Sequence, residues 1–368
     1  MEALRGKHVA MTMTSKERVI AAFEFTEPDR VPVWLGASPE FREKAREFLG
    51  LPDADESLSC HLGDDFRRVF ARYAGPAARD PLLDLRYPGA TYRTPFGVER
   101  HGYGYGQPLH HPLAAARTVA DIEKYEWPEP DWMDVSYIRG EAESWQGQYA
   151  ILGGDWSPFF HDAIDLVGME RLLVDFYEAP IVAEALLAHV ADYYIGTSRR
   201  IFQSAGDVID IFFVGNDFGA QAGPIIGGQV FRRFLLPQLK RFVDLGHEYD
   251  QKVMLHSDGS LYDLIPLFLE IGLDGIQSVQ PSSYKMEPSR LKQAYGDRLA
   301  FMGCIDTQFV LISGTPASVR EQVREVLEVM KPGGGFVASP SHDYLLEETP
   351  VQNVIAMYDA IKEFGRYR

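Results

Sequence analysis

The chain alternates between short apolar runs and longer segments in which apolar residues recur every three or four positions. The short runs begin near residues 30, 66, 149, 208, 252, 274, 299 and 335. A short continuous apolar run is typical of a strand buried on both faces, whereas the longer spacing is typical of an amphipathic helix. The pattern therefore predicts eight strands, most of them followed by a helix.

Strands that alternate with helices pair in parallel, because each helix carries the chain back to the starting edge of the sheet. Eight such units close into a (β/α)8 barrel, and 368 residues fit one barrel with a sizeable insertion. The alternative is an open doubly wound sheet, which usually has a glycine-rich phosphate turn after its first strand. Here that position reads Leu35-Gly-Ala-Ser-Pro. We therefore favour the barrel and expect residues 1–368 to form a single domain.

Two local patterns refine this prediction. Thr14-Ser-Lys-Glu17 is a capping-box sequence and predicts that a helix begins there. Residues 76–132 interrupt the alternation with many Pro, Gly and Tyr residues and short strand-like pieces. We interpret this segment as a hairpin-rich insertion between the second and third strands that helps to cover a pocket.

The net charge of −17 restricts the partners that this chain can bind. Its 53 acidic residues outnumber its 36 basic residues, and no basic block interrupts the acidity. Nucleic acids and anionic membranes both attract cationic surfaces, so neither is an expected partner. An anionic small molecule would need a locally basic pocket.

Cysteine usage and the N-terminal sequence bear on the compartment. Cys60 and Cys304 can build neither a disulfide framework nor a paired Cys-x-x-Cys site, which agrees with a reducing cytosol. Residues 1–19 lack the apolar stretch of a secretory signal, and no run reaches the ~18 apolar residues of a spanning helix. We expect a cytoplasmic protein that acts on a small molecule.

Residues 253–260 carry the most informative chemistry. An apolar run ends there in His256-Ser-Asp258-Gly, and a helical pattern follows at once. On an extended backbone the side chains of His256 and Asp258 point to the same side, because they are two residues apart. The pair suits two metal ligands, an acid/base pair, or a hydrogen-bonded cap.

The barrel prediction brings polar residues near the other apolar runs to the same opening. These residues are Asp65, Asp155, Trp156, Asn216, Asp217, Gln280, Cys304, Asp306, His342 and Asp343. Imidazole and carboxylate, with one thiolate, form a ligand set that zinc takes, with an open position when the site is catalytic. Without a metal, the same groups bind substrate or transfer protons near neutral pH.

Several of these residues also have a simpler interpretation. Asp65 could cap a turn, and Asp306 could cap the following helix. Cys304 could be a small buried apolar residue, and His161 could be a core histidine with satisfied hydrogen bonds.

Six motifs follow one another along the chain. They are Thr14-Ser-Lys-Glu-Arg-Val-Ile-Ala-Ala-Phe, Glu27-Pro-Asp-Arg-Val-Pro-Val, Gly215-Asn-Asp-Phe-Gly, His256-Ser-Asp-Gly-Ser, Gly303-Cys-Ile-Asp and Ser339-Pro-Ser-His. This ordered set resembles the uroporphyrinogen decarboxylase superfamily, which includes the decarboxylase of haem synthesis and cobalamin-dependent methyltransferases. The resemblance covers nearly the whole chain. It implies a (β/α)8 barrel, in agreement with the strand count, and makes a homodimer one possible assembly.

Two departures bear on the branch of the superfamily. The decarboxylases carry arginines just after the first strand, which hold the propionates of the substrate, and residues 35–42 lack them at the strand end. The thiol-using methyltransferases bind zinc through His-x-Cys and a later Cys. The corresponding places hold His256, Asp258 and the neighbourhood of His342, so both thiolates are replaced.

The resemblance therefore implies the methyltransferase component of a corrinoid-dependent demethylation system, with a phenyl methyl ether or methylamine as substrate and the corrinoid on a partner protein. The expected zinc ligands are His256 and Asp258 with His342 or Cys304. The other expected site residues are Asp65, His161, Asn216 and Asp217 for catalysis and orientation, and Trp34, Trp156, Phe160, Gln280 and Tyr284 for substrate binding. One alternative is a decarboxylase of a porphyrinogen or another carboxylated aromatic, with Asp65 or Asp217 stabilising a protonated ring. The other is a non-catalytic carrier of corrinoid or tetrapyrrole.

Overall fold

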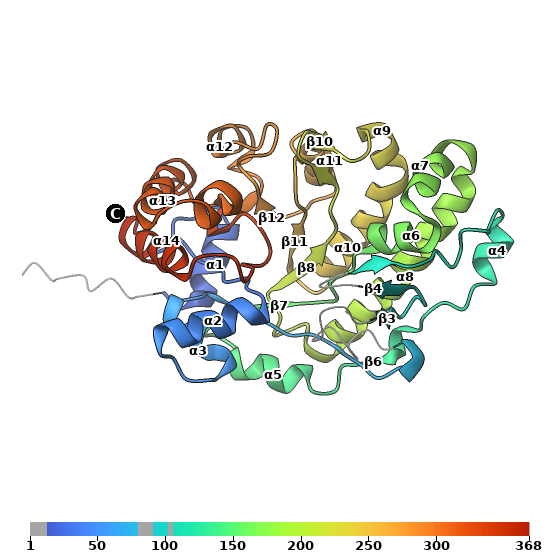
Figure 1. Ribbon diagram of the computed structural model, residues 1–368, viewed down its shortest axis with the longest axis horizontal. Coiled ribbons are helices and arrows are strands. Elements are labelled where there is room, and N and C mark those ends of the chain that lie inside the picture. The colour runs from blue at the N-terminus through green and yellow to red at the C-terminus, as the bar shows by residue number, and fades with distance from the viewer. Residues whose placement is uncertain (1–12, 80–90, 102–105, 368) are drawn as a thin grey trace, which may run out of the picture.

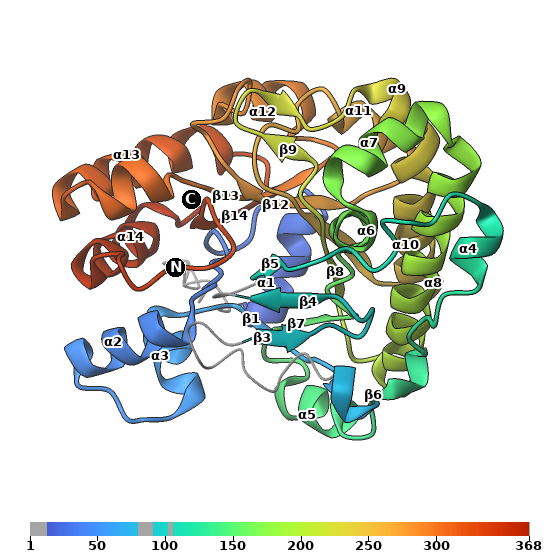
Figure 2. The same cartoon turned by 45° about the vertical axis from the view of Figure 1, so that its right-hand side comes forward.

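A seven-stranded parallel sheet forms the centre of the computed structural model, which describes residues 13–79, 91–101 and 106–367. The strand order is β1 (Phe66–Arg68), β7 (Ala150–Gly153), β8 (Ile211–Gly215), β11 (Lys252–His256), β12 (Gly275–Val279), β13 (Ala300–Ile305) and β14 (Phe336–Pro340). Each strand pairs in parallel with its neighbour. The sheet is curled and surrounded by helices (Figures 1 and 2).

Residues 31–35 close this sheet into a barrel. Val33 forms a parallel bridge with Ala338 of β14, and on the other side its carbonyl oxygen accepts from the Asp65 backbone N–H at 3.0 Å. The ladder stays short because Pro32 has no N–H and the Val33 N–H binds the Asp65 carboxylate. All eight predicted strand positions are thus occupied, and the predicted (β/α)8 barrel is confirmed.

Helices follow most of the barrel strands. Their bounds are α1 (Ser15–Phe23), α2 (Pro39–Leu49), α3 (Asp55–Leu62), α4 (Val119–Glu123), α5 (Ile138–Trp145), α6 (Phe159–Val167), α7 (Met169–Glu178), α8 (Pro180–Ala205), α9 (Gly228–Val230), α10 (Leu236–Glu248), α11 (Ile265–Glu270), α12 (Pro288–Tyr295), α13 (Pro316–Met330) and α14 (Val351–Phe364), with π-helical turns η3 (Phe231–Leu235) and η4 (Thr307–Ile312). The predicted capping box is present, since Thr14 and Glu17 bond reciprocally at the start of α1. Within the described residues, no helix combines the length and the apolar composition that crossing a bilayer requires.

Between β1 and β7 the chain leaves the barrel. The excursion contains β2 (Arg72–Tyr73) paired with β6 (Met133–Asp134), the antiparallel sheet of β3 (Thr91–Arg93), β4 (Glu99–His101) and β5 (Gln107–Pro108), and the 3-10 turns η1 (Ala77–Arg79) and η2 (Pro130–Trp132). Arg100 of β4 forms ion pairs with Asp162, at 2.9 Å, and Asp165 of α6. This excursion is the predicted hairpin-rich insertion, of which residues 80–90 and 102–105 lie outside the described residues.

The barrel interior is packed from its N-terminal end. Inward side chains such as Phe66, Phe213 and Met254 form one apolar cluster with Phe23 of α1. Helix α1 lies at this end of the barrel. Its Ala22 carbonyl oxygen accepts from the backbone nitrogen of Gly335, the residue just before β14, at 2.9 Å. The C-terminal ends of the strands surround the other opening, which we call the mouth. A hairpin of β9 (Gly219–Ala220) and β10 (Gly223–Pro224) lies after β8.

Candidate functional site

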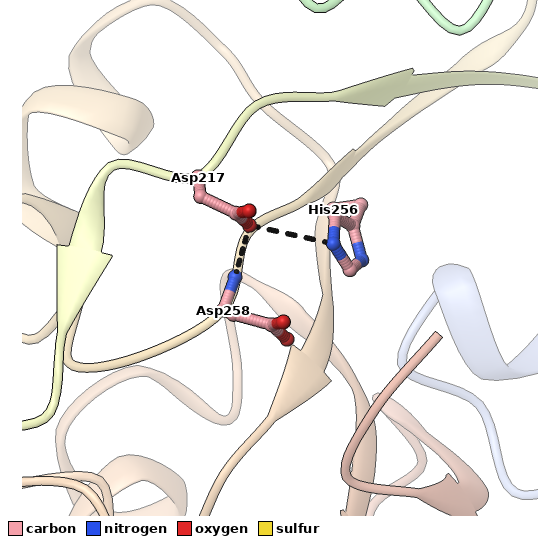
Figure 3. A group of neighbouring side chains, drawn as sticks. All are labelled: Asp217, His256 and Asp258. Carbon is pink, nitrogen blue, oxygen red and sulfur yellow. Dashed lines mark hydrogen bonds and ion pairs between the residues drawn. The ribbon is translucent and has the colours of Figure 1, made fainter. Parts of the chain in front are cut away.

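Three side chains meet at the mouth where β8 and β11 end. Asp217 follows β8, His256 is the last residue of β11, and Asp258 lies two residues further along. One donor atom from each side chain lies within 4.8 Å of the other two, and His256 Nε2 is 3.4 Å from Asp217 Oδ1. Figure 3 shows the Asp217 carboxylate directed at both the imidazole and the backbone nitrogen of Asp258, which donates to it at 2.8 Å.

Backbone register and one glycine explain how these residues come together. In the β8–β11 pairing, His256 lies opposite Gly215. A Cβ at Gly215 would lie only 2.1 Å from the indole of Trp156, so glycine leaves the space that this ring occupies beside His256. Asn216 is buried and connects the loop after β8 with the segment after β7. Its side chain accepts from Phe160 N and donates to the Ser157 carbonyl oxygen.

Outer hydrogen bonds orient the same three groups. Gln277 Oε1 binds Nδ1 of His256, which leaves Nε2 facing the carboxylates. Asp258 Oδ1 accepts from Gln280 Nε2 at 2.9 Å and from the Ser278 hydroxyl. Ser278 reaches this carboxylate because its backbone has a φ of +73° at an irregularity in β12. The Asp258 oxygen Oδ2 remains directed at His342.

The charges of the cluster reinforce one another. Burial lowers the pKa of His256, but the hydrogen bond to Asp217 and the charges of Asp343, Asp258 and Asp217 outweigh it and raise this pKa to about 9. Burial raises the pKa of Asp217, but the His256 contact and the Asp258 N–H lower it to about 2. At neutral pH the pair is therefore imidazolium and carboxylate, and a metal ion binding here must displace a proton.

Two further histidines flank the cluster on its solvent side. His161 Nε2 lies 3.7 Å from Asp217 Oδ2, and His342 Nε2 lies 3.7 Å from Asp258 Oδ2. Both side chains are over a third exposed, in contrast to His256. The mouth thus holds one buried and two accessible imidazoles around two carboxylates.

Three of the expected site residues lie away from this cluster, and a fourth, Trp34, packs in the barrel interior against Phe213. Asp65 precedes β1 at the N-terminal end of the barrel and is fully buried in ion pairs with Arg18 and Arg30. The Cys304 side chain packs in the outer core, between sheet and helices, where burial raises the pKa of its thiol. Phe160 also lies in that outer core, and Trp34 lies in the inner cluster.

The remaining expected residues lie at the mouth or at its edge. Trp156 lies 5.0 Å from the imidazole of His256, measured between ring centroids. Gln280 contacts Asp258, and Tyr284 is more than half exposed after β12. Asp306 caps the turn η4 by accepting from Phe309 N at 2.6 Å.

Sequence reasoning missed one cation at this opening, Arg68. It is the last residue of β1, and its guanidinium lies over the rings of Phe213, at 4.8 Å, and Trp156, at 5.1 Å. The sequence carries a signal for it, an arginine inside the apolar run 66–70, but the strand-end pattern includes only residues that follow each run.

Comparison with known proteins identifies the family. A sequence model described as uroporphyrinogen decarboxylase (URO-D) matches residues 105–364, well over half of the chain. The chain belongs to the uroporphyrinogen decarboxylase family. The resemblance recognised from the ordered motifs is therefore confirmed.

Relatives of two kinds are similar to this member of the family. It is 25% identical over 231 residues to the methylcobamide:CoM methyltransferase MtbA of Methanosarcina acetivorans, and the match covers 62% of each chain, under two thirds of that relative. It is 24% identical over 378 residues to the uroporphyrinogen decarboxylase of Alkalilimnicola ehrlichii, covering 96% of each. A solved methyltransferase structure from Methanosarcina mazei has a TM-score of 0.64 at 20% identity, covering 96% of this chain and 99% of that one. The structural likeness supports the fold, while both reactions remain represented among the sequence relatives.

Proposed function

We propose that this protein is the methyltransferase component of a corrinoid-dependent demethylation system. It takes a methyl group from a small methylated aromatic compound and passes it to a corrinoid held by a separate protein. The observation that carries the proposal is the cluster of Asp217, His256 and Asp258 at the mouth. The likeness to MtbA, whose name includes methylcobamide, supports the choice of methyl transfer.

The donor set fits a catalytic zinc ion. Imidazole nitrogen and carboxylate oxygen bind zinc at 2.0–2.2 Å, which places neighbouring ligand atoms of a tetrahedron about 3.3 Å apart. His256 Nε2 and Asp217 Oδ1 are 3.4 Å apart, and Gln277 provides the outer contact typical of a ligating imidazole. Three protein ligands leave a fourth position for substrate. When bound, zinc supplies Lewis-acid polarisation of the methyl-bearing atom.

The protein's own side chains orient the substrate and manage its proton. The indole of Trp156 offers a flat surface beside His256 for an aromatic ring. His161 and His342 are accessible, and each lies 3.7 Å from a carboxylate of the cluster. They are placed to give a proton to the heteroatom that loses its methyl group.

Exposed apolar side chains surround the mouth and suit a docking partner. They follow the strand ends at Phe70 after β1, Tyr284 after β12, Phe309 after β13, and Tyr344 and Leu346 after β14. Large apolar side chains that remain exposed near one another mark interaction surfaces. We assign this rim to the corrinoid protein, because its cobalt must reach the methyl group from the open end of the barrel.

Metal analysis and a methyl-transfer assay test the proposal. Purified protein should contain about one zinc per chain, and His256→Ala should lose both the zinc and methyl transfer to a reduced corrinoid protein, followed by its absorbance. His247→Ala is the matched control, because His247 is exposed on α10 and pairs with Asp274 outside the cluster. Full methyl transfer by zinc-free His256→Ala would refute the proposal.

Decarboxylation is the second candidate, favoured by the likeness to uroporphyrinogen decarboxylases over 96% of this chain. In that reaction the Asp217 carboxylate at the mouth would stabilise a protonated ring. Incubation with uroporphyrinogen separates the two functions. Carbon dioxide release that is lost in Asp217→Asn would favour the decarboxylase.

A further inference from the structure

We propose that Arg68 binds a carboxylate of the substrate, so that the methyl donor is a small aromatic acid. The inference rests on the proposed function in one respect, since it places the ligand in the same mouth. It concerns a different group from the Asp217–His256–Asp258 cluster. It also assigns a role to a cation that the proposed chemistry does not use.

The strand register directs Arg68 into the barrel. Phe66, two residues earlier in β1, belongs to the inner cluster, so Arg68 faces the same side. Its guanidinium lies over three rings, those of Phe70 at 4.5 Å, Phe213 at 4.8 Å and Trp156 at 5.1 Å. These rings form an aromatic wall around a positive charge.

The guanidinium of Arg68 has donors left to use. Within the described part of the chain, its Nε and Nη2 atoms are buried and have no hydrogen-bond partner, and no acidic side chain forms an ion pair with it. The charge of the neighbouring Arg67, in contrast, is compensated by an ion pair with Glu56, and Arg67 also donates to the Phe66 carbonyl oxygen at 2.6 Å. Buried N–H donors without an acceptor are unfavourable, so such donors are expected where a ligand supplies the acceptor.

Gln277 of β12 and Asp343, in the segment after β14, add polar atoms in the same condition. Among the described residues, Gln277 Nε2 and Asp343 Oδ1 are also buried without a partner. The mouth therefore offers a cation, an amide donor and a carboxyl group that are not consumed by the fold.

Arg42, another arginine close to the first strand position, already uses its donors within the protein. Arg42 of α2 donates to the carbonyl oxygens of Ala37 and Leu35 and to the hydroxyl of Ser59, each at 3.3 Å. The guanidinium of Arg68 is planar, as is a carboxylate, and the two can form a bidentate pair.

Trp156 fixes the direction of the ligand. Its ring centroid lies 5.1 Å from the guanidinium carbon of Arg68 and 5.0 Å from the centroid of the His256 imidazole. An aromatic ring lying against this indole directs its carboxylate to Arg68 and its methyl-bearing substituent to the cluster. The substrate class that fits both ends is a methoxylated aromatic carboxylic acid.

Isothermal titration of the metal-free protein with 4-methoxybenzoate and the neutral 4-methoxybenzamide tests the inference. Wild type should prefer the carboxylate by about 10- to 100-fold, the range of a charge-assisted hydrogen-bonded pair. Arg68→Met should lose this preference, whereas Arg68→Lys should keep part of it because the charge remains without the planar fork. Arg72→Met is the charge-matched control, since Arg72 is exposed in β2, and should bind as wild type does.

Absence of the preference in wild type, its persistence in Arg68→Met, or no binding of the acid at millimolar concentration would each overturn the inference. Circular dichroism checks the fold of each variant, and Arg68→Gln replaces Arg68→Met if the latter fails to fold. The metal-free format separates this result from the proposed function. If the protein transfers methyl groups but binds the acid no better than the amide, only the inference about Arg68 is refuted. If it prefers the acid but transfers no methyl group, only the proposed function is refuted.

Discussion

Asp65 joins three parts of the chain at the closed end of the barrel, and we predict that it acts on stability. Its side chain is 0% exposed. It accepts from Arg18 Nη1 at 2.7 Å, from Arg30 Nη1 and Nη2 at 2.8 Å, from Val33 N at 2.8 Å and from the Ser15 hydroxyl at 2.7 Å. These contacts connect α1, the closing segment 31–35 and β1.

Asp65→Ala removes the carboxylate that both arginines share, while Arg18 keeps its second ion pair, with Asp29. Arg18 is itself nearly buried, with 7% of its side chain exposed, whereas a quarter of the Arg30 side chain is exposed. Breaking a buried ion pair on one side costs about 3–5 kcal/mol, and we expect the lower end of this range because Asp29 still pairs with Arg18 at 2.6 Å. Asp65→Asn keeps an oxygen for the Val33 N–H but loses the charge, so we expect about 1.5–3 kcal/mol.

Urea unfolding followed by circular dichroism measures these losses of the free energy of unfolding. Asp53→Ala is the control, because Asp53 also pairs with an arginine but is 96% exposed, and it should change stability by less than about 0.5 kcal/mol. Methyl transfer per folded molecule should stay close to wild type in Asp65→Asn, because the residue lies at the end opposite His256. A stable Asp65→Asn protein without activity would refute this reasoning and restore Asp65 as a catalytic residue.

Two further predictions concern Asp64 and Gly215. Burial raises the pKa of Asp64 to about 7, from 3.8, against the lowering by Arg67 and the Phe66 N–H. A raised carboxyl pKa means that the folded state holds the proton longer, so its contribution to stability is present below pH 4 and is lost as the pH rises toward 7. At pH 8 the Asp64→Asn protein should avoid this loss, so its free energy of unfolding should exceed that of wild type by roughly 2–4 kcal/mol and its melting temperature should be higher. At pH 4 the two proteins should differ little. Calorimetry at both pH values measures this. Equal melting curves at both pH values would contradict the prediction. Gly215→Ala should displace the Trp156 indole, because the added Cβ would occupy its place. We expect kcat/KM for methyl transfer to fall by about 10- to 100-fold, since small displacements of a positioning group have effects of this size. The zinc content should stay unchanged. Unchanged kcat/KM would show that the indole position does not matter.

The fold was predictable because most barrel strands are continuous apolar runs. The runs near residues 252 and 274 became β11 and β12 with almost the predicted starts. The first run differs, since Pro32 and the Asp65 carboxylate shorten its ladder to a bridge. This shortening of the strand pairing depends on Asp65, which is distant in sequence, so the local apolar pattern could not predict it.

The site was predictable only where local geometry decides the direction of a side chain. The two-residue spacing of His256 and Asp258 was sufficient to expect both at one opening, where the structure has them. Cys304 was expected there as well, but its backbone has a φ of +70° and its side chain packs outward. Arg68 was overlooked because short strands bring their last residue, and not only the following loop, into the mouth.

Helix α1 lies across the N-terminal end of the barrel, and this imposes an order of events on the proposed reaction. A methyl donor and a corrinoid protein then have to share one entrance. The small molecule must be in place before the larger partner covers the rim, and the demethylated product can leave only after that partner has moved away. Turnover would therefore be governed by how long the two proteins stay together.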